Sequence, residues 1–151
     1  MIVTLLGLQV SAVPLRAQAH YPPISQRVFS SGSVEIKVSG AFSMDVKVPL
    51  NTQASIGGGD MTWLQYGASG STAPNALITF NDLGEVGINV AQGTVQGVSG
   101  IGGEKPWCTG KVDVKPKMIT GDYTCVGAAS HDKATGGMGK VTISLKFTAG
   151  S

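Results

Sequence analysis

Apolar and polar residues alternate strictly along three stretches of the chain, and this alternation limits the fold more than any other feature. The stretches are VEIKV at 34–38, FSMDVKV at 42–48 and KVTISLKFT at 140–148. A period of two residues places successive side chains on opposite faces of a β-strand, whereas a helix needs a period near 3.6. Strands with one buried and one wet face are typical of antiparallel sheets. The side chains expected on the buried faces are Val34, Ile36, Val38, Phe42, Met44, Val46, Val48, Val141, Ile143, Leu145 and Phe147.

Further strands are predicted over residues 61–66, 76–80, 86–90 and 94–98, where weaker apolar patterns lie between glycine-rich joints. Strands at intervals of ~8–12 residues, separated by turn signals, favour a sandwich or a barrel. The sequence therefore predicts an all-β fold, either an antiparallel β-sandwich or a flattened β-barrel of about 7–9 strands.

The chain has two cysteines, Cys108 and Cys125, and they lie in a stretch that reads as a hairpin. If residues whose numbers add up to 233 face each other, the two cysteines are directly opposed. Apolar side chains then share one face, and Lys111 opposes Asp122 on the other. Residues 115–118 become a four-residue loop containing Pro116, which suits the second position of a type I turn.

Directly opposed residues lie ~4.5–5.5 Å apart, inside the range that a disulfide tolerates. A structural zinc site would need four ligands, and the CxxC spacing of redox sites is absent. We therefore expect Cys108 and Cys125 to form a disulfide across the hairpin. In the chain-entropy argument a loop of this size gives about 3 kcal/mol of stability.

Residues 1–19 differ in character from the rest of the chain. They are mostly apolar and end in Ala17-Gln18-Ala19, the small-residue pattern of a signal-peptidase site. The apolar run is too short for a bilayer, which needs ~20 residues. We expect a secretory signal peptide at 1–19 and a single β domain at 20–151; the alternative is an N-terminal arm that packs on the fold or pairs with a neighbour. A leader and a disulfide together predict a secreted or periplasmic protein.

Composition excludes several classes of protein. Hydrophobic residues make up 42% of the chain, which argues against disorder, and charged residues only 13%. The formal net charge is +2, with no cluster of basic residues that could neutralise nucleic-acid phosphates. We expect no nucleic-acid partner and no transmembrane span.

Ser130, His131 and Asp132 are residue types of a catalytic triad, but they are adjacent in sequence. Neighbouring side chains cannot form the serial hydrogen bonds of a triad, so we interpret them as a polar turn before the last strand. No other set of catalytic residue types stands out, and the sequence predicts no enzyme.

His20 would become the N-terminal residue if cleavage follows Ala19. Its amino nitrogen and imidazole, with His131 as a second imidazole, would suit Cu(II). This arrangement resembles the copper brace of lytic polysaccharide monooxygenases and the N-terminal histidine of CopC-type copper carriers, and the resemblance implies a copper site. The chain lacks the Asp-x-His of the carriers and is short for a monooxygenase. The alternative is a histidine that follows the cleavage site by chance.

Trp63, Tyr66 and Trp107 are candidates for a ligand-binding surface, because aromatic side chains are frequent at such surfaces. The alternative is that they pack in the core. A small β-barrel could also hold one small apolar ligand.

These observations favour an exported, non-catalytic β-module of the cell envelope or extracellular space that binds a protein partner or self-assembles. The alternative function is the binding of a small ligand or of copper through His20.

Overall fold

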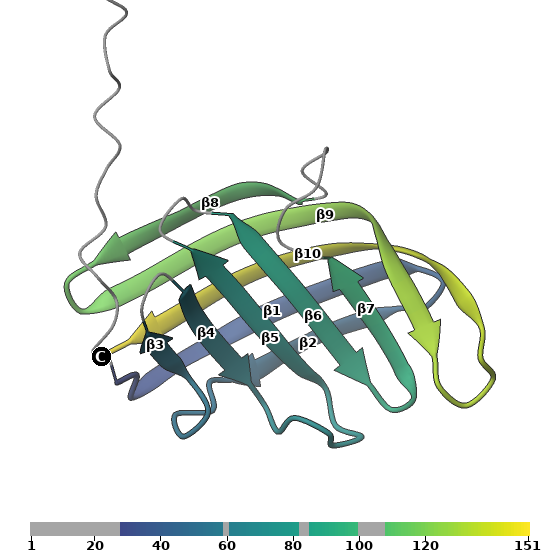
Figure 1. The fold of residues 1–151 in the computed structure, drawn as a ribbon, viewed down its shortest axis with the longest axis horizontal. Helices are drawn as coiled ribbons and strands as arrows, with labels where there is room; N and C mark the ends of the chain where they lie inside the picture. The colour runs from purple at the N-terminus through teal and green to yellow at the C-terminus, as the bar shows by residue number, and fades with distance from the viewer. Residues whose placement is uncertain (1–27, 59–60, 82–84, 100–107) are drawn as a thin grey trace, which may run out of the picture.

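The computed structural model describes residues 28–58, 61–81, 85–99 and 108–151. Ten antiparallel strands form one sheet in these ranges (Figure 1). Their bounds are β1 Ser31–Gly40, β2 Met44–Pro49, β3 Ile56–Gly58, β4 Met61–Tyr66, β5 Asn75–Asn81, β6 Val86–Gln92, β7 Val95–Ser99, β8 Cys108–Lys115, β9 Met118–Asp132 and β10 Met138–Gly150. No helix that could cross a membrane occurs in the described ranges.

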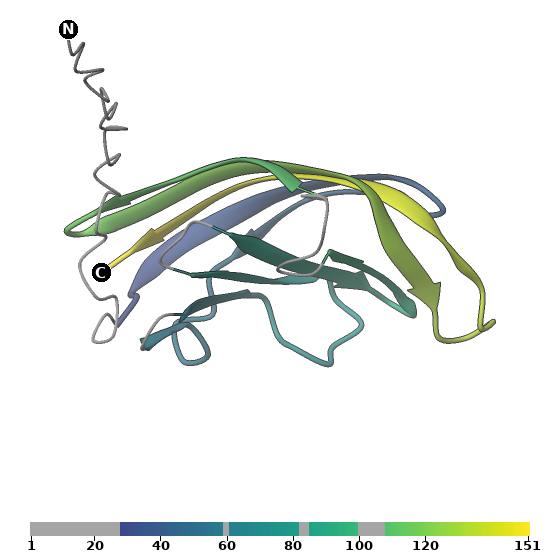
Figure 2. The ribbon, with the colours of Figure 1, turned by 45° about the horizontal axis from the view of Figure 1, so that its top comes forward.

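The sheet runs in the order β2-β1-β10-β9-β7-β6-β5-β4-β3, and β8 pairs with β9 beside this path. It curls into a half-barrel, so that β3 to β7 lie across the concave side of the longer strands (Figure 1). Figure 2 shows the purple β1 and the yellow β10 arching over these shorter strands. The predicted all-β, antiparallel fold is confirmed. The four weaker strands that the sequence predicted are β4 to β7, and the three-residue β3 is an addition to them.

A bulge in β9 lies where the sheet changes direction. Val126 and Gly127 of β9 oppose the single residue Thr142 of β10. Gly127 has a φ of 73°, which a residue without Cβ adopts at little cost. On one side of the bulge β9 pairs with β8, and on the other side it pairs with β7. Because a bulge increases local twist, this point lets the long strands turn over the core.

The core lies between the two halves of the curled sheet, and the alternation in the sequence identified much of it. The predicted side chains that are buried are Val34, Ile36, Val38, Met44, Val48, Val141, Ile143, Leu145 and Phe147, while Phe42 and Val46 are partly buried. The ring of Phe147 lies at the centre, 6.4 Å from that of Phe80 and 6.5 Å from that of Tyr66 between ring centroids. Gly121 opposes Phe147 on β9, and any side chain at 121 would collide with this ring.

One corner of the half-barrel is tied together where β2 and β4 end. Leu50 forms a β-bridge with Tyr66, and the Gly67 N–H donates to the carbonyl of Pro49 at 2.9 Å. The Tyr66 hydroxyl donates to the carbonyl of Thr148 at 3.0 Å. Burial raises the pKa of the Tyr66 phenol, so this hydroxyl remains a donor. The edge strand β2 is thereby joined to the opposite half of the molecule.

The interpretation of residues 130–132 as a turn is wrong. They are the last residues of β9, which continues seven residues beyond Cys125. The turn is at 133–135. The bulge at Gly127 changes which residues face inward, and this change hid the strand from a search for regular alternation.

Candidate functional site

The hairpin of β8 and β9 has the pairing that the sequence predicted, with Cys108 opposite Cys125 and Lys111 opposite Asp122. The two cysteines form a disulfide, and their Cα atoms are 3.9 Å apart, closer than expected. The prediction of a four-residue loop over residues 115–118 is wrong, because Lys115 still pairs with Met118. Two residues remain to make the turn, so the strands stay paired up to their ends.

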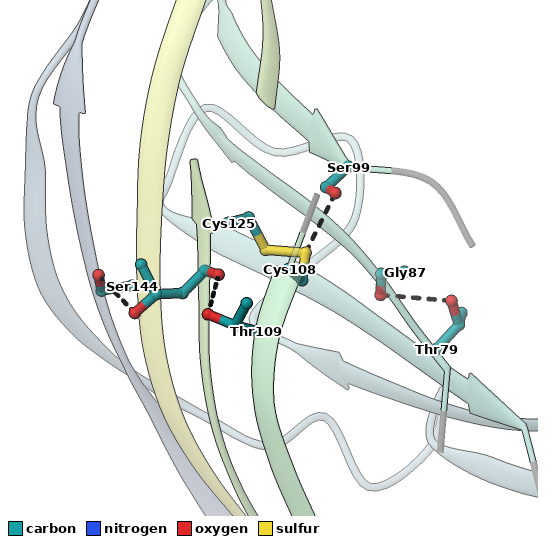
Figure 3. Close-up of a disulfide and its surroundings, with 8 residues drawn as sticks. Thr79, Gly87, Ser99, Cys108, Thr109, Cys125 and Ser144 are labelled. Atoms are coloured by element: carbon teal, nitrogen blue, oxygen red, sulfur yellow. Dashed lines mark hydrogen bonds between the residues drawn. A yellow bond between two sulfur atoms is a disulfide. The ribbon is translucent and has the colours of Figure 1, made fainter. Parts of the chain in front are cut away.

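The disulfide lies where three strands meet (Figure 3). The hydroxyl of Ser99, the last residue of β7, is 3.1 Å from the sulfur of Cys108, the first residue of β8. Both strands use the same edge of β9, one on each side of the Gly127 bulge. The disulfide therefore holds the first residue of β8 to β9 at the point where the pairing of β9 with β7 ends.

Beyond β9, β8 pairs with no other strand that the structure describes. We call its far side, which faces away from β9, the open edge. None of the residues of β8 is buried, although Val112 and Val114 are partly covered and touch the core. No strand in the described ranges pairs with the backbone groups along the open edge, and edge strands commonly use such groups to pair with another chain.

The pairing pattern identifies the amides that face outward. Opposed residues of antiparallel strands alternate between hydrogen-bonded pairs, with Cα atoms ~5.5 Å apart, and closer pairs without hydrogen bonds. The 3.9 Å between Cys108 and Cys125 marks their pair as the second kind. Because the pattern repeats every two residues, the N–H and C=O groups of Gly110, Val112 and Val114 point away from β9.

A row of alternating charges crosses the outer face of the sheet and stops at the open edge. The order from β2 to β8 is Lys47, Glu35, Lys146, Asp122 and Lys111, each opposite the next. Lys47 pairs with Glu35 at 3.3 Å, and Lys146 pairs with Asp122 at 3.8 Å. Lys111 makes no ion pair with any described residue. Lys111, at the β8 end of the row, is therefore the one member that forms no ion pair among the described residues, although it lies opposite Asp122.

The other edge strand of this half, β2, has its charges paired within the chain. Asp45 lies 3.8 Å from Lys37, and Lys47 lies 3.3 Å from Glu35. Pro49 ends the strand and has no backbone donor. This edge carries two features that discourage pairing with another chain, which are proline and already paired charges.

Ser130, His131 and Asp132 alternate across β9 and do not form a catalytic chain. Ser130 is buried, whereas His131 is exposed on the opposite face. The carboxylate of Asp132 accepts a hydrogen bond from the hydroxyl of Thr94 and another from the Ala134 N–H at 2.9 Å, and the two lower its pKa. Asp132 thus shapes the turn rather than orienting an imidazole.

A cleft of about 220 Å³ lies between the β1–β2 turn, the start of β7 and the β9–β10 hairpin. It is lined by Ala41, Phe42, Val95, Ser130, His131, Asp132, Thr135, Gly137, Met138 and Gly139. Pockets that hold small ligands usually measure ~300–1,000 Å³. The volume of the cleft is below that range, so the cleft is not evidence for a small-ligand site.

The aromatic candidates do not share one surface. Tyr66 is fully buried in the core, whereas Trp63, on the same strand, is 37% exposed on the outer face. Trp107 and His20 lie outside the described residues, as does the predicted leader. Within the described ranges, no three His, Cys, Asp or Glu residues are grouped so that they could hold a metal ion.

No family model, curated protein or solved structure matches the chain. A function therefore has to be inferred from the geometry of the molecule, in which the open edge of β8 is the most distinctive feature. The sequence carried part of this signal in the alternating charges of Lys111, Asp113 and Lys115. The sequence did not show the topology, in which β9 is the one strand of the described ranges that pairs with β8.

Proposed function

We propose that the protein is an exported, non-catalytic module that binds a protein partner by strand addition along the open edge of β8. The observation that carries this proposal is the outward set of backbone donors and acceptors at Gly110, Val112 and Val114. In strand addition, main-chain hydrogen bonds supply affinity and the alternating side chains supply specificity.

The attachment of β8 to β9 supports this proposal. The strand is fixed to β9 by the disulfide at Cys108 and by a two-residue turn after Lys115. Binding normally costs the ordering of side chains and loops, and a strand already held in an extended conformation by its ladder avoids much of that cost. The hairpin therefore presents a preorganised edge.

The disulfide is compatible with an oxidising compartment. Together with the apolar leader predicted at 1–19, it supports a place in the periplasm, at the cell envelope or outside the cell. A module that works there through its backbone edge needs no cofactor.

The test is native mass spectrometry of the protein isolated from its own source, as wild type, Val112→Ala and Val112→Pro. Proline removes the outward N–H at 112 without touching the hydrogen bonds to β9, since proline is tolerated on such edges. Alanine keeps the N–H and is the matched control. We expect complexes from wild type and Val112→Ala, and mainly single subunits from Val112→Pro.

Two results would overturn the proposal. One is wild-type protein that appears as a single subunit without any protein partner. The other is a complex that survives Val112→Pro unchanged, because the contact would then lie elsewhere on the molecule.

A second candidate function, copper binding, is favoured by one pair of residues. His131 directly opposes Met138 on the β9–β10 hairpin, and both side chains are exposed. An imidazole beside a thioether suits copper, and His20 at a free N-terminus would supply further nitrogen ligands. The same spectra test this candidate, since a copper-sized adduct lost in His131→Ala would support it and an unaltered mass after addition of copper would exclude it.

A further inference from the structure

We infer that the partner of β8 is a second copy of this chain, joined through an antiparallel β8–β8 pair centred on Val112. This inference rests on the proposed function, because it names the occupant of the same open edge. In this arrangement residues whose numbers add up to 224 face each other across a two-fold axis. Val112 then faces Val112 of the second copy, and Lys111 faces its Asp113.

The backbone supports this register. Gly110, Val112 and Val114 point their N–H and C=O groups outward, and the register pairs them with one another. Val112 exchanges two hydrogen bonds with its counterpart, and each Gly110–Val114 pair exchanges two more, or about six in total. A shift by one residue would place polar side chains opposite apolar ones on each face of the joined sheet.

The side-chain charges select the same register. Lys111 faces the second copy's Asp113, whose carboxylate also lies 3.5 Å from Lys115 of its own chain, and the symmetric pair repeats the contact. This contact supplies the counter-charge that Lys111 lacks among the described residues, and it extends the alternating row beyond β8. A shift of two residues in either direction brings Lys111 opposite Lys111 or Asp113 opposite Asp113. Like charges directly opposed destabilise a strand pair.

A pair through β2 is less suited to the same role. Its six residues end at Pro49, and Asp45 and Lys47 already have ion partners within the chain. β8 offers eight residues without a proline. On β8, Asp113 pairs with Lys115 at 3.5 Å, and Lys111 has no ion partner among the described residues. The two edges therefore differ in hydrogen-bonding capacity and in the one unpaired lysine, and both differences favour β8.

The test is sedimentation velocity of the purified chain alone over a wide range of concentration, for wild type, Val112→Ala, Val112→Pro and Asp113→Lys. We expect wild type and Val112→Ala to form dimers as concentration rises. Val112→Pro removes two of the interchain hydrogen bonds and should weaken association by about tenfold to a hundredfold. Asp113→Lys places two like-charged pairs across the axis and should also weaken it.

Asp45→Lys on β2 is the control for the change in charge, and it should dimerise as wild type does. An intact disulfide and an unchanged circular dichroism spectrum establish that each variant is folded. If Val112→Pro and Asp113→Lys formed dimers as strong as those of wild type, the inference would be overturned.

A wild-type chain that stays monomeric at every concentration would also overturn it, and the native-source spectra then decide the fate of the broader proposal. If those spectra show a different protein bound, and lost in Val112→Pro, strand addition at β8 stands with another occupant. If they show a single subunit, both proposals fail.

Discussion

The two edge strands of the long half of the sheet, β2 and β8, are held in different ways. β2 buries Met44 and Val48 in the core and continues into the corner that Leu50 closes. β8 buries no residue and is joined to the fold by its ladder with β9 and by a disulfide. A strand held by packing contributes to the stability of the fold. A strand held by a disulfide needs less packing, and its outer backbone groups can serve for binding. This difference makes β8, and not β2, the edge that we propose for binding.

Removal of the disulfide should have the largest effect and should act on one edge. Replacing Cys108 and Cys125 together by alanine is expected to lower the free energy of unfolding by about 3 kcal/mol, from loop entropy. Denaturation in urea measures the total loss in the free energy of unfolding. Amide hydrogen exchange should show lost protection in β8 with little change in β2, and equal loss at both edges would contradict separate attachment.

A pair of alanine substitutions compares how strongly each edge is packed. Met44→Ala removes a side chain that is 4% exposed and should cost about 2–3 kcal/mol. Val112→Ala removes a partly exposed side chain and should cost less than about 1 kcal/mol. Urea denaturation of dilute protein measures both, and comparable costs would show that β8 is packed as firmly as β2.

The surface charges give a smaller contrast. Lys47→Ala breaks an exposed ion pair with Glu35 and should cost about 0.2–1 kcal/mol, an effect that added salt reduces. Lys111→Ala should leave the stability of the monomer unchanged, because Lys111 pairs with no described residue. If Lys111→Ala lowered the free energy of unfolding as much as Lys47→Ala does, Lys111 would already have an ion partner within its own chain.

The smallest effect concerns the β9–β10 turn, which lies away from both edges. The pKa of Asp132 is lowered in the folded protein, chiefly by the hydrogen bonds from Thr94 and Ala134. Its contribution is therefore present above the ordinary carboxyl pKa of ~4 and is lost as pH falls through the lowered value. The protection of the Ala134 amide relative to its intrinsic exchange rate should fall under acid in wild type but vary less with pH in Asp132→Asn. An identical response in the two proteins would contradict this role.

Sequence alternation predicted most of the sheet because the long strands β1 and β10 and the edge strand β2 each have one buried face. The hairpin register was predictable in detail, since pairing Cys108 with Cys125 also brings Lys111 opposite Asp122. Residues 126–132 escaped prediction because the bulge at Gly127 interrupts the alternation. The open edge could not be predicted from the sequence, since it depends on the long-range topology, in which no second described strand pairs with β8.

The most direct test of the central claim is amide hydrogen exchange of the wild-type chain at low and at high concentration. The account predicts that the amides of Gly110, Val112 and Val114 exchange rapidly in dilute protein and become protected as concentration rises, while those of β2 do not change. Protection of β2 with concentration, or exchange in β8 that is the same at both concentrations, would contradict it.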